Sequence, residues 1–144
     1  MFNATNPAAM LVPMLVVVAL TFIAFIRMAQ MRGAAVKGGH DPSYYRAHIG
    51  DPEPEPTRAA VRHFDNLFEV PTVFHAACIT AFVLSLASGW ALAFAWGFAV
   101  CRVIQSTVHL TSNNTMLRGV FFSLGVIFLL ALWVVIAGAV FARL

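Results

Sequence analysis

Charge is the property this sequence most lacks. Asp, Glu, Lys and Arg make up 10% of its 144 residues, whereas a soluble domain carries about 25%. A soluble globule of this length cannot bury so much apolar surface, because small domains hide only about two-thirds of what the unfolded chain exposes. With 60% hydrophobic residues and a mean hydropathy of +0.82, the composition indicates a single-domain integral membrane protein. It excludes disorder and nucleic-acid binding.

Cysteine is scarce as well, and the histidines do not form a metal-binding pattern. Cys78 and Cys101 lie inside apolar runs without CxxC spacing, so we interpret them as small buried hydrophobic residues. No two of the five histidines have HxxxH spacing, which gives no reason to expect zinc. His75 and His109 lie in apolar spans at depths too different to share a haem. We therefore expect neither metal nor haem, and a hydrogen bond from His75 to a neighbouring helix.

Four apolar runs are long enough to cross a bilayer, which takes about 20 residues. The sequence therefore predicts an all-α fold, a four-helix transmembrane bundle of up-down topology in which residues 1–144 form one domain. The alternating prolines from Asp51 to Pro56 predict an extended spacer, not a helix, between the first two spans. The predicted spans and the long loop lie at about 8–29, 66–88, 90–110 and 118–141, with the loop at about 32–61.

The cations predict the orientation of the bundle in the membrane. Most of them lie in the first loop and its flanks, and the N-terminal tail has none. By the positive-inside rule this loop is cytoplasmic, and both termini are outside. The predicted protein is multi-pass and surrounded by membrane lipids. The cations of the first loop and its flanks are Arg27, Arg32, Lys37, Arg46, Arg58 and Arg62.

A few ionisable side chains lie inside the predicted spans, where each costs about 2.5–3.5 kcal/mol and marks a candidate functional site. Span two begins with Arg62, Asn66 and Glu69, whose i, i+4, i+7 spacing predicts one helical face. A second series with similar spacing ends span three: Arg102, Gln105 or Ser106, and His109. Arg27 ends span one and Arg118 begins span four, so all these groups are expected at the cytoplasmic end of the bundle.

The polar residues of spans two and three are expected at similar depths in the membrane. At 1.5 Å per residue, Glu69 lies about 8 Å and Arg102 about 12 Å below the cytoplasmic surface. Four arginines around one carboxylate predict a site for an anion that also carries a cationic group. Two plainer interpretations stay open. Glu69 and Arg102 form an interhelical ion pair, or the arginines anchor the spans by facing lipid headgroups.

Two segments that carry these residues resemble a known family, the membrane-associated proteins in eicosanoid and glutathione metabolism (MAPEG). RHFDNLFEVP at residues 62–71 is similar to the family's R-x-x-x-N-x-x-E pattern followed by proline. CRVIQSTVHLTSNNTMLR at residues 101–118 resembles the end of the third helix and the next turn of the microsomal glutathione transferases. The resemblance covers the whole chain and points to the small bacterial branch of the family.

The resemblance implies a homotrimer of four-helix bundles that binds glutathione as co-substrate between adjacent subunits. It implies that Arg62, Asn66 and Glu69 hold the backbone of glutathione and that Arg118, the catalytic residue, stabilises its thiolate. Further glutathione contacts are implied for Arg27, Arg102 and His109. The implied activity is a transferase or peroxidase reaction on lipophilic electrophiles or hydroperoxides, in the bacterial inner (plasma) membrane.

One departure from the family keeps a second function open. His109 stands where members with transferase activity often have tyrosine, and histidine is shorter and titrates near neutrality. The alternative function is a non-catalytic accessory or structural subunit of a larger membrane assembly, whose polar cluster binds a lipid headgroup or a partner subunit.

Overall fold

The computed structural model describes residues 6–87 and 89–144, and these form helices without any strand. Four helical stretches are long and apolar enough to cross a membrane, so the predicted all-α, four-span architecture is confirmed. The elements are η1 (Pro7–Met10), α1 (Leu11–Lys37), α2 (Tyr44–Ala47), α3 (Glu55–Asn66), α4 (Val70–Val83), α5 (Gly89–Leu110) and α6 (Thr115–Phe141). The spans are Pro7–Lys37, Glu55–Val83, Gly89–Leu110 and Thr115–Phe141.

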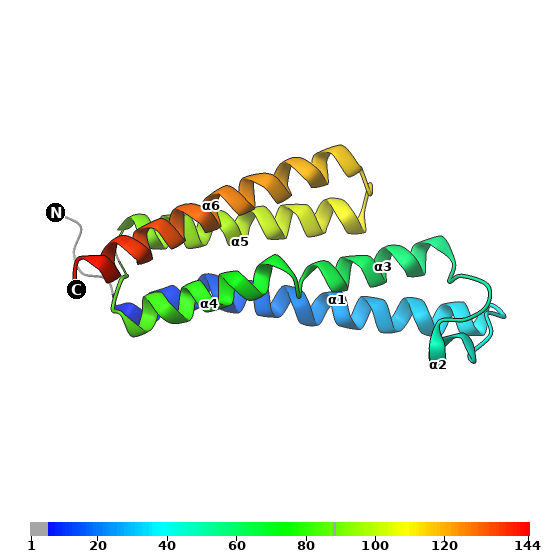
Figure 1. Ribbon diagram of the computed structural model, residues 1–144. Coiled ribbons are helices and arrows are strands. Elements are labelled where there is room, and N and C mark those ends of the chain that lie inside the picture. The colour runs from blue at the N-terminus through cyan, green and yellow to red at the C-terminus, as the bar shows by residue number, and fades with distance from the viewer. Residues whose placement is uncertain (1–5, 88) are drawn as a thin grey trace.

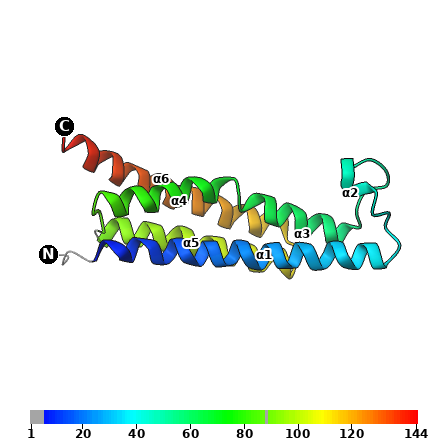
Figure 2. The same cartoon turned by 90° about the horizontal axis from the view of Figure 1, so that it is seen from below.

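The helices run up and down in one bundle (Figure 1). α1 packs against α3 and α4, and α5 and α6 form a second hairpin with the most extensive interhelical contact. The described ends of the chain lie at the same end of the bundle, and α2 lies at the other (Figures 1 and 2). α1 and α3 continue beyond the turn that joins α5 to α6. These two helices and the loop between them therefore form the end of the molecule opposite the termini.

The apolar core fills the half of the bundle that is nearer the termini. Its centre is the stacked pair Phe74 and Phe98, whose ring centroids are 4.2 Å apart. Small residues on α4 and α5 belong to the same core. The core alanines on these helices are Ala77, Ala81, Ala91, Ala95 and Ala99. Polar side chains are buried in the other half, and that half therefore holds the candidate site.

The helices around the first loop are longer than predicted. α1 continues to Lys37 and α3 already begins at Glu55, so the loop is shorter than the expected residues 32–61. The prediction that Glu55 and Pro56 belong to an extended spacer is wrong, because they form the first turn of α3. Proline fits that turn, since its missing N–H has no helical acceptor there. Hydropathy locates the apolar part of a helix but not its polar ends.

The second span is interrupted where a continuous helix was predicted. α3 ends at Asn66 and α4 begins only at Val70. Pro71 has no N–H to donate to the carbonyl of Leu67, so the helical hydrogen-bond ladder stops at this point. The N–H of Leu67 turns back to the carbonyl of Phe64 at 3.0 Å. The prediction of one unbroken helical face in this span is therefore wrong.

An ion pair fastens the loop between α1 and α3. Arg32 Nε lies 3.1 Å from Glu53 Oε1, and Glu53 is 5% exposed. The guanidinium of Arg32 also lies over the ring of Tyr45, 5.2 Å from its centroid. Burial, followed by the nearby Glu53 carboxylate, raises the pKa of Tyr45 above its ordinary value. The loop is thus held by charged and aromatic side chains.

Candidate functional site

Four of the predicted site residues line one cavity of about 390 Å³ between α3, the break after it and the start of α6. We call it the α3–α6 cavity. Arg62, Asn66 and Glu69 contribute to one side although the helix is broken between Asn66 and Glu69. Arg118 contributes to the other side. The full lining is Arg62, Asp65, Asn66, Glu69, Asn113, Thr115 and Arg118.

The turn before α6 positions Arg118. Asn114 caps this helix, because its side-chain oxygen accepts from the N–H of Leu117 at 3.1 Å. Asn113 adopts a left-handed backbone conformation with φ of 49°, and its Oδ1 accepts from Arg118 Nη1 at 2.8 Å. This hydrogen bond uses one nitrogen of the guanidinium. Arg118 Nε is buried and has no partner among the described residues.

Glu69 lies in the break and immediately precedes α4. It is exposed and forms no ion pair with any residue that the structure describes. The Glu69–Arg102 ion pair that the sequence left open is therefore not formed within this part of the chain. The first turn of α4 follows directly, and the start of a helix favours negative charge nearby. The break thus adds an electropositive backbone terminus beside the cavity.

Arg102 does not line the α3–α6 cavity. A smaller space of about 280 Å³ adjoins the α3–α6 cavity and shares Asn66 and Arg118 with it. Gln105 lines this adjoining space, and its Oε1 accepts from Arg102 Nη1 at 2.8 Å. Arg102 is 1% exposed, and two rings, Phe98 and Phe122, lie over its guanidinium with centroids at 4.9 Å and 4.8 Å. Arg102 therefore contacts the lining of this space only indirectly, through its hydrogen bond to Gln105.

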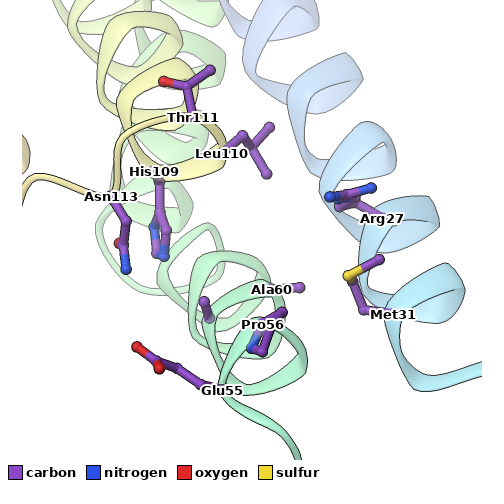
Figure 3. A pocket seen from close by; sticks show the side chains of 10 residues that line it. Arg27, Met31, Glu55, Pro56, Ala60, His109, Leu110, Thr111 and Asn113 are labelled. Carbon is purple, nitrogen blue, oxygen red and sulfur yellow. The ribbon is translucent and has the colours of Figure 1, made fainter. Parts of the chain in front are cut away.

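Arg27 and His109 line a different cavity of about 270 Å³, which we call the α1–α5 cavity (Figure 3). Beside it, His63 Nε2 and Ser106 Oγ are 2.9 Å apart, and the rings of His63 and His109 lie 4.9 Å apart. Within one chain, the structure thus divides the predicted site residues other than Arg102 between two cavities, which share Asn113. The lining of the α1–α5 cavity is Arg27, Met31, Glu55, Pro56, Ala59, Ala60, His109, Leu110, Thr111 and Asn113.

Sequence reasoning missed three residues of the α3–α6 cavity, namely Asp65, Asn113 and Thr115. Asp65 follows Arg62 by three residues, a spacing that places both on one side of α3, so the signal was present. The cavity consequently holds two guanidinium and two carboxylate groups. Its charges are balanced, whereas the sequence predicted a strong excess of arginine.

The two cysteines and His75 are the remaining side chains that could take part in chemistry. Cys78 and Cys101 are buried free thiols, which confirms their interpretation as buried residues. His75 Nε2 has no hydrogen-bond partner among residues 6–87 and 89–144, so the predicted bond to a neighbouring helix is wrong. His75 instead lines an apolar groove beside Phe22 and Phe68. Among the same residues, no group of three His, Cys, Asp or Glu side chains is placed to hold a metal ion.

The four spans and the charged cavities define a multi-pass membrane protein with polar cavities at one end of its helical bundle. The family model of the MAPEG family matches residues 10–138, nearly the whole chain. The chain therefore belongs to the MAPEG family, whose members are membrane proteins of eicosanoid and glutathione metabolism. Neither a curated protein nor a solved structure matches it in the comparisons.

Proposed function

We propose that the chain binds glutathione in the α3–α6 cavity and activates its thiol for reaction with lipophilic electrophiles or hydroperoxides. The observation that carries this proposal is the set of Arg62, Asn66, Glu69 and Arg118 around one space of about 390 Å³. Glutathione has two carboxylates, one ammonium group and a thiol. Arg62 matches one of its carboxylates, Arg118 matches its thiolate, and Glu69, with Asp65 beside it, matches its ammonium.

Arg118 is the proposed catalytic residue. A cation within about 4–6 Å of an acid lowers its pKa by about 1–3 units, which turns more of the bound thiol into the nucleophilic thiolate at neutral pH. The sulfur then forms a bond to an electrophilic carbon while the leaving group departs with its electron pair. The hydrogen bond to Asn113 holds the guanidinium in place during this step.

The proposed assembly is a homotrimer in the bacterial inner membrane, with both termini outside and the first loop cytoplasmic. Arg62 and Glu69 are exposed in the single chain, so one chain leaves the ligand open on one side. A neighbouring copy would close this side. The glutathione contacts predicted for Arg27 and His109 remain predictions, because these residues line the other cavity of their own chain.

Two substitutions separate binding from activation in an ultraviolet thiolate titration of the purified protein with glutathione. Arg118→Ala is expected to remove the thiolate band with a smaller effect on affinity. Glu69→Gln is expected to weaken binding about tenfold, the value of one charge-assisted hydrogen bond. Arg46→Ala, an exposed position in the first loop, is the control. Loss of binding in Arg118→Ala without any thiolate band in the parent protein would contradict the role of Arg118.

One observation favours the second candidate, a non-catalytic accessory subunit. His109 replaces the tyrosine expected of active relatives, and it is buried at 6% exposure beside His63 and outside the α3–α6 cavity. The same titration separates the two functions. An accessory subunit would give no thiolate band at millimolar glutathione.

A further inference from the structure

An apolar groove of about 400 Å³ lies between α1 and the broken second span, where α1 runs beside α3 and α4 (Figure 1). We call it the α1–α4 groove. Its lining comes from α1, α3, the break after α3 and α4, so the groove crosses the point at which the second span is interrupted. Within the described part of the chain, it shares no lining residue with the α3–α6 cavity or the α1–α5 cavity. The groove is therefore separate from both cavities that hold the predicted site residues.

The groove lies at the level of the bilayer hydrocarbon. The first span, Pro7–Lys37, has 31 residues, and a crossing takes about 20. Any stretch of about 20 residues within this span includes the groove residues Phe22 and Phe25. Its described lining contains no Asp, Glu, Lys or Arg side chain. A molecule that fills the groove therefore comes from the membrane, and it is lipophilic and uncharged, because charge is costly at this depth.

Aromatic rings form much of the wall of the groove. The phenylalanines that line it are Phe22, Phe25, Phe64 and Phe68. The ring centroids of Phe25 and Phe64 lie 5.7 Å apart across the two helices, and those of Phe64 and Phe68 lie 4.8 Å apart. Phe22 and Phe68 are 64% and 57% exposed, so their rings are accessible to a ligand. Aromatic rings gain energy from stacked or edge-to-face contact beyond the area they bury, and this wall therefore favours a flat conjugated ring over a saturated one.

His75 gives the groove a polar group. Thr21 also lines it, but the hydroxyl of Thr21 donates to the carbonyl of Val17 at 3.0 Å. His75 Nε2 is buried and has no hydrogen-bond partner among the residues that the structure describes. An ionisable side chain inside a membrane span is costly, and a buried polar atom without a partner is rare in folded proteins. Both observations point to a ligand that brings a hydrogen-bonding oxygen to His75.

We propose that the α1–α4 groove binds a membrane quinone, which combines a flat conjugated ring, hydrogen-bonding oxygens and an apolar tail without any charge. The ring lies against Phe22 and Phe68, and a ring oxygen accepts a hydrogen bond from His75. The tail continues along α1 into the hydrocarbon. The volume of about 400 Å³ lies within the range of about 300–1,000 Å³ that is usual for small-molecule sites. This site goes beyond the proposed function, because it needs neither glutathione nor the residues of the α3–α6 cavity.

Native mass spectrometry of the delipidated full chain tests this site with two ligands. The first is a benzoquinone whose ring carries three methyl groups and a decyl chain, so that no ring position is free to react with thiols. The second is decylcyclohexane, which has the same chain but neither a flat ring nor an oxygen. The parent protein is expected to bind one quinone per chain and to retain it about tenfold better than decylcyclohexane, the combined effect of one hydrogen bond and one ring contact.

Substitutions test the two parts of the site separately. His75→Leu should lower quinone retention about fivefold, the effect of one hydrogen bond, and should leave decylcyclohexane unchanged. Phe68→Ala should also lower quinone retention. Phe82→Ala is the matched control, because Phe82 is a 40% exposed phenylalanine of α4 that does not line the groove. His75→Gln keeps a side-chain donor and should retain the quinone better than His75→Leu does.

Three outcomes would overturn the assignment. They are equal retention of the two ligands by the parent protein, unchanged quinone retention in His75→Leu, and a loss in Phe82→Ala as large as in Phe68→Ala. If no quinone binds and Phe68→Ala alone changes the number of chains in the assembly, a neighbouring copy covers the groove and the quinone site is wrong. The glutathione thiolate band should be unchanged in His75→Leu, so this proposal and the proposed function fail separately.

Discussion

Replacing Arg102 by methionine separates what the buried guanidinium does for folding from what it does for the site. The side chain is 1% exposed, Phe98 and Phe122 lie over its guanidinium, and one of its nitrogens donates to Gln105. Its Nε and Nη2 have no partner among the residues the structure describes. Methionine is unbranched and flexible, so it fills much of the same space without a charge.

The expected change in stability is small because two opposing effects are of similar size. Removing an arginine from a membrane span relieves about 2.5–3.5 kcal/mol. The substitution loses two cation–π contacts of about 1 kcal/mol each and a hydrogen bond to a charged group of about 1.5 kcal/mol or more. The free energy of unfolding should therefore change by about 1 kcal/mol or less. Glutathione binding should fall about tenfold, because Gln105 loses the group that orients it.

Thermal unfolding in detergent and calorimetric titration with glutathione measure the two effects. Arg102→Met is expected to shift Tm by less than about 5 °C. Gln105→Leu should reproduce its loss of binding, and the double substitution should add little, since both changes remove one interaction. A large fall in Tm would show that Arg102 stabilises the fold and would refute the small effect expected here. Unchanged glutathione binding would refute its action through Gln105.

Three further predictions concern packing and the first loop. Gly97→Ala should lower stability by about 1–3 kcal/mol, because the new Cβ would lie 2.7 Å from Phe128 Cδ1. Gly119→Ala, with open space around it, is the control in thermal unfolding. Ultraviolet titration should show Tyr45 ionising above its ordinary pKa of 10.0. Its neutral form favours the folded loop, so this stabilisation is lost as pH rises through the raised pKa. Glu53→Gln should make the loop easier to cleave by protease, since it breaks the ion pair with Arg32.

The sequence was sufficient for the number of spans because apolar length in a membrane protein is a direct physical requirement. It was less informative about where helices stop. The break before Val70 follows from the missing N–H of Pro71. The predicted second span began only a few residues before Pro71, where a proline is compatible with the first turn of a helix, so no break was predicted. The helical extensions at Lys37 and Glu55 are polar, and hydropathy does not distinguish a polar helix from a polar loop.

Spacing along one helix predicted part of the site but not its division between cavities. Arg62 and Glu69 were grouped by helical periodicity and do line one space. Arg27 and His109 lie on other helices, and which cavity they join depends on how α1 and α5 pack. Depth alone placed Arg102 beside Glu69, but rotation of α5 about its axis turns Arg102 toward Phe122 on α6. Periodicity within one helix does not specify that rotation.

The ultraviolet difference spectrum of the unmodified protein, titrated with glutathione at neutral pH, is the decisive measurement. We propose that Arg118 and its neighbours around the α3–α6 cavity hold glutathione as its thiolate. A saturable thiolate band is then expected at millimolar glutathione or below, and it should disappear in Arg118→Ala. If the protein neither binds glutathione nor gives a thiolate band at millimolar concentration, the proposed function is wrong.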